Sequence, residues 1–308
     1  MDSFDVVVIG GGAAGLNAAV VLARARRRVA VVDAGEPRNA PAAHVHGFLS
    51  RDGMAPGRLL EVGRAEVVGY GGALVTDRVV RIEPGFAVLL AGGRALRARR
   101  VLVATGLRDE LPDVPGLRAR WGRDVLHCPY CHGYEVRDRP IGVLGSLHLG
   151  LLLPQWSADT VFFPHRTELS AGEREQLVAR GVRIADGEVT GLVVDGDVLR
   201  GVELADGRVV PRSALFVAPR FVPRAELLTG LGCATDDAGR VRTDPTGRTG
   251  VPGVWAAGNV VDPRAQVVTA AGAGCAAAIA LNADLVQEDV QRAVAAVGAR
   301  TRLATHPH

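Results

Sequence analysis

The first 33 residues hold the pattern that most restricts the fold of this chain. The segment "FDVVVIGGGAAGLNAAVVLARARRRVAVVD" (4–33) reads as a strand, a glycine-rich turn, a helix and a second strand. The β-branched run from Val6 to Ile9 is typical of a parallel strand that is buried on both faces. A strand–helix–strand unit of this kind predicts an α/β fold built on a mostly parallel sheet.

The turn after the first strand has the spacing G-x-G-x-x-G. Gly10 permits the tight turn, Gly12 lets the backbone approach a pyrophosphate, and Gly15 lets the helix pack close to the strand. The helix N-terminus then offers N–H groups to phosphates, and Asp33 ends the second strand where an acid can bind ribose hydroxyls. The pattern predicts a dinucleotide site, with a tight turn that binds no ligand as the alternative.

Two later segments favour FAD over NAD in this site. The segment "RRVLVATG" (99–106) is a strand that ends in Ala-Thr-Gly, and "GVWAAGNVVDPRAQVVTAAGAGCAAAIALN" (253–282) is a strand, a glycine turn and a long helix of small residues. Both patterns are typical of flavoproteins with two dinucleotide-binding domains. In such proteins the last segment lays a helix N-terminus against the flavin ring.

The stretch "HCPYCHGYE" (127–135) allows three interpretations: a redox disulfide, half of a zinc site or a c-type haem attachment site. Haem attachment normally needs export, and "MDSFDVVVIG" has no basic region before its apolar run. Zinc needs four ligands, and His44 and His46 are expected in the other domain. A purely structural disulfide is rare in the cytoplasm. The stretch therefore favours a redox pair formed by Cys128 and Cys131.

The order of these segments resembles the low-molecular-weight thioredoxin reductases over nearly the whole chain. The resemblance implies a discontinuous FAD domain (1–113 and 246–308) and an inserted second Rossmann-like domain (114–245) that carries the cysteines. It implies flavin contacts at the following positions: Gly10, Gly12, Ala13, Ala14, Gly15, Asp33, Thr105, Gly106, Gly258, Asn259, Gln266 and Val267. Asn259 and Ala265 depart from the Asp and Arg usual there, and each departure removes a charge near the flavin.

The resemblance also implies roles for the cysteine pair. Cys131 would face the flavin, and Cys128 would exchange with the sulfur of the substrate. The family has an acid directly after the second cysteine, where this chain has His132, and a small or aromatic residue before the first, where it has His127. Histidine suits removal of a thiol proton near neutral pH. We expect at least one of the two to be catalytic, with His127 preferred for the substrate thiol.

The second nucleotide segment departs from the family pattern. In "IGVLGSLHLGLLL" (141–153), Leu147 holds the middle glycine position, where its side chain would fill space that a pyrophosphate needs. The family places an arginine cluster after the next strand, and this chain offers His165 and Arg166 followed by Glu168, which would repel a phosphate. We predict that NAD(P)H is not bound; a divergent site that still binds, with a preference for NADH, is the alternative.

The histidine before C-P-Y-C is similar to a narrower group, the dithiol oxidases that close the disulfides of gliotoxin, holomycin and romidepsin. These run without nicotinamide and pass electrons to oxygen. The resemblance implies an FAD-dependent oxidase that forms a disulfide in a small dithiol and turns O2 into H2O2. The alternatives are an NAD(P)H-dependent disulfide reductase and a flavin redox sensor without turnover.

Composition narrows the remaining classes of partner. All 36 basic residues are arginine and the net charge is only +3, so Schiff-base lysine chemistry is excluded and a nucleic-acid footprint is not expected. The uncharged run 267–283, rich in Ala and Gly, is shorter than the roughly 20 apolar residues of a membrane span and predicts a buried helix. We expect a cytoplasmic protein without a resident metal, and the resemblance implies a homodimer.

Overall fold

The computed structural model describes residues 2–304, with side chains described to residue 297, and divides the chain into two compact units. Unit 1 comprises the chain up to Pro37, Arg58–Leu107 and the chain from Pro223 onward. Unit 2 comprises Arg38–Gly57 and Arg108–Val222. The second unit is thus inserted into the first.

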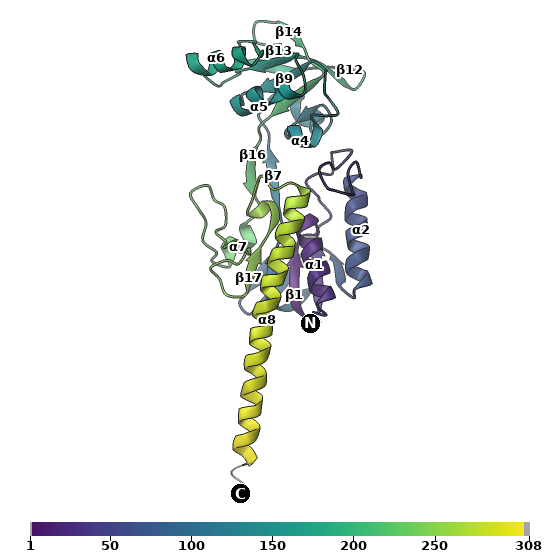
Figure 1. The fold of residues 1–308 in the computed structure, drawn as a ribbon, viewed down its shortest axis with the longest axis vertical. Coiled ribbons are helices and arrows are strands. Elements are labelled where there is room, and N and C mark those ends of the chain that lie inside the picture. The colour runs from purple at the N-terminus through teal and green to yellow at the C-terminus, as the bar shows by residue number, and fades with distance from the viewer. Residues whose placement is uncertain (1, 305–308) are drawn as a thin grey trace. The chain divides into compact units, whose positions relative to one another are not determined.

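Unit 1 is built on a seven-stranded sheet with the order β3-β2-β1-β6-β5-β4, in which β17 also pairs with β6. Figure 1 labels β1 and β17 of this sheet. Five strands are parallel: β1 (Asp2–Ile9), β2 (Val29–Asp33), β3 (Ala73–Thr76), β6 (Ala95–Val103) and β17 (Val254–Ala256). The antiparallel strands β4 (Val79–Glu83) and β5 (Ala87–Leu90) complete the sheet. The predicted α/β class is confirmed.

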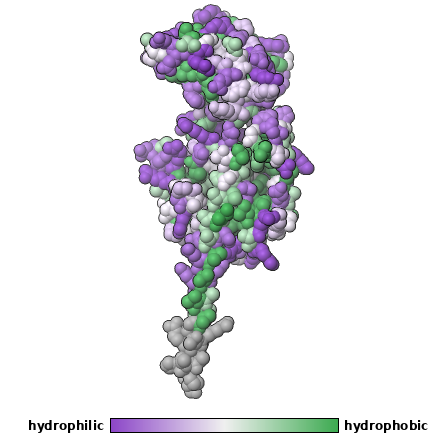
Figure 2. Space-filling model, viewed as in Figure 1, coloured by the Kyte–Doolittle hydropathy of each residue, from purple (hydrophilic) through white to green (hydrophobic). Residues whose placement is uncertain are grey.

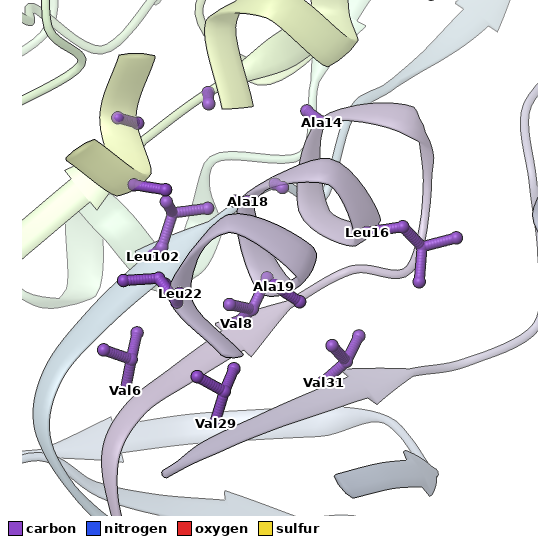
Figure 3. Close-up of a cluster of buried hydrophobic side chains, with 14 of the residues drawn as sticks. Val6, Val8, Ala14, Leu16, Ala18, Ala19, Leu22, Val29, Val31 and Leu102 are labelled. Atoms are coloured by element: carbon purple, nitrogen blue, oxygen red, sulfur yellow. The ribbon is translucent and has the colours of Figure 1, made fainter. Parts of the chain in front are cut away.

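Strand β1 lies at the centre of this sheet and is buried on both faces. Val8 is in register with Val31 of β2 and Leu102 of β6. On one face, Val6 and Val8 pack in a cluster with residues of α1 (Ala13–Arg24), α2 (Pro56–Gly69) and α8 (Val267–Ala304), part of which Figure 3 shows. On the other face, Val7 joins a second cluster that includes residues of α7 (Glu226–Gly230). Burial on both faces explains the unbroken apolar run in the sequence.

Helices α1 and α8 approach each other closely because small residues line their contact. A Cβ added to Gly274 would lie 2.0 Å from the carbonyl oxygen of Ala14, so only glycine fits there. The predicted buried helix is confirmed for the following residues of 267–283: Ala270, Ala271, Ala277, Ala278 and Leu281.

The later part of α8 carries exposed valines, among them Val286, Val290 and Val294. Figure 2 shows hydrophobic surface along this part of the molecule. By length and composition alone, Val267–Val297 could also cross a membrane, although 33% of its most apolar window is buried in the protein. Arg100 on β6 pairs with Asp284 of α8 and ties the helix to unit 1.

Unit 2 contains a second Rossmann-like layer. Its parallel sheet has the order β11 (Arg183–Ile184), β10 (Thr160–Phe163), β9 (Ile141–Leu144), β15 (Ala214–Val217) and β8 (Val125–Leu126). Helices α5 (Leu147–Leu152) and α6 (Ala171–Ala179) cover one face, and an antiparallel sheet of β12 (Val189–Asp195), β13 (Val198–Leu204) and β14 (Val209–Pro211) covers the other. Strands β7 (Leu107–Glu110) and β16 (Arg220–Pro223) pair where the chain passes between the units. Two short helices, α3 (Leu117–Arg120) and α4 (Pro129–His132), complete it.

The unit boundaries differ from the expected ranges 1–113, 246–308 and 114–245 at two segments. Residues 38–57 belong to unit 2, where Arg38 forms a two-pronged ion pair with Asp109 and Pro41 lies against Gly122. Residues 223–245 belong to unit 1 because side chains such as Leu228 are buried in its core. The placement of His44 and His46 in the other domain was therefore wrong: both lie in the unit that holds the cysteines.

The contact of α1 with α8 predicts opposite effects for two glycines of the same helix. Gly274→Ala should lower the free energy of unfolding by about 1–3 kcal/mol, because the added methyl overpacks the contact with Ala14. Gly272→Ala is the matched control, since no described atom lies within 4 Å of its Cβ position, and should raise stability by up to about 1 kcal/mol. Urea unfolding measures both; equal effects of the two substitutions would contradict the close packing.

Candidate active site

The residues expected to hold FAD gather at one edge of the unit 1 sheet. The glycine turn follows β1, Asp33 ends β2, Thr105 and Gly106 follow β6, and Gly258 follows β17. These four strands are parallel, so their carboxyl ends meet at the same edge, which is where open α/β sheets bind ligands. Gln266 and Val267 stand at the start of α8, whose N-terminus lies close to Gly258 through Ala270.

The glycine turn leaves bare backbone where a pyrophosphate would lie. Gly10 has φ +104° and packs on the carbonyl oxygen of Ala104, and a Cβ on Gly15 would lie 1.9 Å from the carbonyl oxygen of Gly10. At Gly12, by contrast, no described atom lies within 4 Å of the Cβ position. Gly12 is also the N-cap of α1 and supplies no capping side chain, so the helix N-terminus is open to an anion. The turn fits the phosphates of a dinucleotide.

Asp33 is fixed by contacts to its own turn. One carboxylate oxygen accepts a hydrogen bond from the N–H of Gly11 at 3.1 Å, and the other pairs with Arg64 at 3.2 Å. These contacts fix the Asp33 carboxylate beside the glycine turn, where it can accept hydrogen bonds from ribose hydroxyls. Arg64, on α2, was not singled out from the sequence, because a lone arginine in a helix carries no motif.

Two other expected contacts are engaged with neighbouring backbone. The Thr105 hydroxyl donates to the carbonyl oxygen of Arg224 at 2.6 Å, which ties the end of β6 to the returning chain. The Asn259 amide donates to the carbonyl oxygens of Asp262 at 3.0 Å and Ala265 at 2.9 Å. An aspartate at position 259 could not donate to these carbonyls, so the asparagine has a local structural reason: it shapes the loop before α8.

The cysteine pair lies in unit 2 at the start of a single helical turn. Cys128 and Cys131 form a disulfide with Cα atoms 5.2 Å apart; Cys128 is the N-cap of α4, and Pro129 is its first residue. Tyr130, between them, stands edge-on to Trp156 with ring centres 5.7 Å apart and remains 64% exposed. The disulfide excludes two thiolate zinc ligands in this state. The N–H groups of Cys131 and His132 both donate to the carbonyl oxygen of Cys128 at 3.1 Å, so the backbone turn holds the two cysteines close together.

His127 is oriented so that one ring nitrogen remains available as a base. Its Nδ1 lies 3.1 Å from the carbonyl oxygen of Val217, which only accepts, so Nδ1 carries the proton and neutral Nε2 holds the lone pair. The ring packs edge-on against Phe221 at 5.1 Å, and Arg38 covers the same Phe221 ring. Burial, more than any other effect, lowers the pKa of His127 and keeps the ring neutral at pH 7.

His132 sits in a different environment on the other side of the pair. Both of its ring nitrogens are buried, and neither meets a described group with hydrogen-bonding geometry. Burial lowers the pKa of His132, while Glu135 acts in the opposite direction and His46 in the same direction. Glu135 was not identified as a site residue from the sequence. The histidines at 44 and 46 in a loop were the available signal, but their unit had been assigned wrongly.

The second nucleotide segment differs from the first in its helix cap and in the residue at its middle position. Leu147 is the first residue of α5 and packs, half-buried, against the core beneath the helix. Ser146 caps the helix: its Oγ accepts the N–H of Leu149 at 3.5 Å. Gly150 touches Leu177 and Phe162 and so serves packing. Unlike the turn at Gly12, this turn offers a phosphate neither bare backbone at its middle position nor an uncapped helix end.

The basic residues after β10 are also engaged elsewhere. His165 Nδ1 accepts the N–H of Val189 at 3.0 Å, and burial, first of all, lowers the pKa of His165. Arg166 pairs with Glu188 at 2.7 Å. A neutral histidine and a paired arginine give weak recognition of a 2′-phosphate.

The open turn at Gly12 predicts that a side chain there lowers flavin binding without changing the stability of the flavin-free protein. Gly12→Ala should leave the stability of the flavin-free protein unchanged within about 0.5 kcal/mol, because the methyl meets no described atom. It should still lower bound flavin, because the methyl occupies the place of the phosphates. Absorbance near 450 nm per protein chain measures this. Gly69→Ala, whose added methyl also meets no atom of the described residues, is the control and should keep its flavin; equal retention by both would refute the phosphate assignment.

The lowered pKa of His127 predicts a dependence of stability on pH. Below pH 6.5 the unfolded chain takes up a proton at position 127 before the folded chain does, so the folded state loses stability as the pH falls through this window. The difference in unfolding free energy between the wild type and His127→Gln should therefore shrink from pH 7 to pH 5. A difference that grows toward acid would mean that the ring is protonated in the folded protein.

Comparison with known proteins agrees with this arrangement. A family model described as pyridine nucleotide-disulphide oxidoreductase matches residues 4–275. The chain is 32% identical to thioredoxin reductase sirT of Leptosphaeria maculans, covering 93% of this chain and 96% of that one. It is 31% identical to the thioredoxin reductase of Streptomyces coelicolor, covering 90% and 92%. The crystal structure of HlmI superposes with a TM-score of 0.94 at 61% identity and covers 97% of each chain.

The matched region spans both units, including the glycine turn of unit 1 and the cysteine pair of unit 2. The relatives match this chain over nearly its whole length, and the fold is shared with the solved structure. The chain therefore belongs to the pyridine nucleotide-disulphide oxidoreductase family and is a flavin-dependent thiol/disulfide oxidoreductase with a thioredoxin reductase-like fold.

Proposed function

We propose that this protein is an FAD-dependent dithiol oxidase, which closes a disulfide within a small-molecule dithiol and passes the electrons to O2, giving H2O2. The observation that carries the proposal is the contrast between the two glycine turns. The turn at Gly12 is open to phosphates, whereas the turn at Ser146 and Leu147 is capped and packed by its own side chains. Electrons then have one entrance, the cysteine pair.

The substrate reaction at this pair is a double thiol–disulfide exchange. One substrate thiolate attacks Cys128, forms a mixed disulfide and releases Cys131 as the leaving thiolate. The second substrate thiolate attacks the substrate sulfur of the mixed disulfide, which closes the product ring and leaves both cysteines reduced. Each attacking thiol must lose a proton. His127, with Nδ1 bound to Val217 and Nε2 unprotonated, is the proposed acceptor for the substrate thiol.

FAD would be held by the backbone from Gly10 to Gly15, by Asp33, and by the loop before α8. When bound, FAD supplies two-electron acceptance from the cysteine pair and delivery of those electrons to O2. The chain's own residues provide the binding edge, the exchanging sulfurs and the proton acceptors. Overall, a dithiol loses two hydrogens and O2 gains them.

A disulfide reductase driven by NAD(P)H is the second candidate, because relatives such as that of Streptomyces coelicolor are named thioredoxin reductases. That reaction needs the segment at 141–153 to bind a nicotinamide dinucleotide. The Ser146 cap and the pairing of Arg166 with Glu188 argue against it. We also propose a homodimer, which is supported by the exposed valines of α8.

Anaerobic rapid mixing of the oxidised, FAD-loaded protein separates the candidates. Dithiothreitol, as a simple dithiol, should bleach the flavin absorbance, and admission of air should restore it with release of H2O2. NADPH should leave the absorbance unchanged. Fast bleaching by NADPH would sink the oxidase proposal in favour of the reductase, and inertness to both reagents would leave a redox sensor.

If the cysteine pair passes electrons to the flavin, replacing the sulfur of Cys131 should strongly slow reduction of the flavin. Cys131→Ser should slow bleaching by dithiothreitol by more than about a hundredfold, since the sulfur expected to face the flavin is removed. Cys275→Ser, which replaces a free cysteine of α8 in unit 1, is the control and should react at the wild-type rate. Unimpaired bleaching of Cys131→Ser would show that electrons reach the flavin by another route.

A further inference from the structure

His127, the proposed proton acceptor, lies at the ends of two neighbouring strands. β8 and β15 are parallel, with Leu126 in register with Phe216, so His127 follows β8 opposite Val217, the last residue of β15. Its Nδ1 is 3.1 Å from the carbonyl oxygen of Val217. This hydrogen bond selects one edge of the ring, but it restrains the ring plane only weakly, because the χ2 torsion of histidine is broad and roughly two-fold.

Phe221 supplies the missing restraint on the plane of the ring. It belongs to β16, which pairs with β7. The rings of Phe221 and His127 stand edge to face, with centres 5.1 Å apart and planes at 85°, an arrangement that aromatic pairs prefer. A ring at an intermediate angle would lose this contact, and a ring flipped by half a turn would lose the bond to Val217. The two contacts together specify one orientation.

The ring of Phe221 is itself held by a charged pair. The guanidinium carbon of Arg38 lies 5.1 Å from the centre of the Phe221 ring, within the range of a cation–π contact. Arg38 donates from Nε and Nη2 to the two carboxylate oxygens of Asp109, at 2.8 and 2.7 Å. The Asp109 side chain is only 10% exposed. Because such a fork has a fixed geometry, it holds the guanidinium plane over the ring. We call Arg38, Asp109 and Phe221 the clamp.

The charges of the clamp leave the His127 ring neutral. Burial, first of all, lowers the pKa of His127; the carbonyl of Val217 opposes this effect, Arg38 adds to it and Asp109 opposes it. Among the described residues, Arg38 and Asp109 are the charged side chains that act on the ring, and their opposite charges are paired with each other. The clamp therefore acts mainly through the orientation of the ring and the nitrogen that carries its proton.

We propose that Phe221, held by Arg38 and Asp109, is a positioning residue that fixes the plane of the His127 ring, so that Nδ1 keeps its proton on Val217 and the lone pair of Nε2 keeps one direction. A base accepts a thiol proton only within hydrogen-bond reach and in the right tautomer. The inference rests on the proposed role of His127 as the acceptor for the substrate thiol, and it does not depend on the direction of electron flow.

Nitrogen NMR of labelled histidine in the full, oxidised, FAD-loaded protein reads the tautomer directly, at about pH 8, where histidine is ordinarily neutral. The His127 signals are assigned by their loss in His127→Gln. Phe221→Leu removes the aromatic ring and keeps an apolar side chain. It should lower the fraction of Nδ1 that is protonated and speed hydrogen exchange there by about two- to tenfold, as expected for one lost aromatic contact. Phe221→Tyr keeps the ring and should retain the wild-type values.

Arg38→Lys tests the clamp without removing its charge. Lysine lacks the planar fork, so exchange at Nδ1 should again be faster, by about two- to fivefold. Arg174→Lys, which breaks a two-pronged pair with Asp186 in the same unit, is the matched control for the arginine. Phe4→Leu replaces a half-buried phenylalanine of unit 1 that also lies beneath an arginine. Both controls should leave the histidine signals unchanged. Wild-type exchange in Phe221→Leu and Arg38→Lys, or equal increases in the controls, would overturn the proposal.

A double-mutant cycle asks whether Phe221 affects the reaction through His127 alone. In single-turnover bleaching by dithiothreitol, Phe221→Leu should lower the maximal rate by about two- to tenfold, at an unchanged half-saturating concentration of dithiol. In a His127→Gln background the same substitution should have no further effect. Equal slowing in both backgrounds would indicate a structural role only and overturn the proposal.

Failure of the proposed function gives different results. A His127→Gln protein that reacts at the wild-type rate would remove the base from the exchange, and with it the catalytic purpose of the clamp. Fast bleaching by NADPH would instead sink the oxidase reaction and leave the NMR result for the His127 ring in place.

Discussion

The absence of a side chain at one backbone position is the constraint on which the rest of the molecule depends. No described atom lies within 4 Å of the Cβ position of Gly12. Gly10 and Gly15 let β1 and α1 approach each other closely, so the helix N-terminus points at the sheet edge. At Gly274 the lack of a side chain likewise lets α8 pack closely against Ala14. The edge where the strands end therefore remains open, and the loops after four parallel strands converge on it.

Unit 2 repeats the strand, turn and helix but closes the equivalent space. Ser146 satisfies the helix end with its own hydroxyl, and Leu147 contributes its side chain to the core. The two units share the strand, turn and helix, and they differ in whether a side chain caps the N-terminus of that helix. In unit 2 the reactive group is instead the Cys128–Cys131 disulfide, flanked by His127, whose ring is fixed by a carbonyl oxygen, and by His132, whose ring nitrogens are buried.

The sequence predicted local features well where one physical rule decided them. The run from Val6 to Ile9 is buried as its β-branched residues required, and the small residues of α8 pack where a larger side chain would collide. The sequence did not predict contacts between segments that lie far apart along the chain. Nothing local in 38–57 indicates that Arg38 pairs with Asp109 or that His46 meets Glu135. The amide bonds of Asn259 likewise depend on how a later loop folds back.

The central claim is that electrons enter through the cysteines and leave to oxygen without a nicotinamide. Steady-state turnover of the FAD-loaded protein with excess dithiothreitol in air-saturated buffer tests it most directly, with an oxygen electrode and a peroxide assay. The account predicts one O2 consumed and one H2O2 formed per disulfide, at a rate that added NADPH does not change. A protein that is idle with the dithiol alone, and that consumes NADPH while it reduces disulfides, would contradict the account.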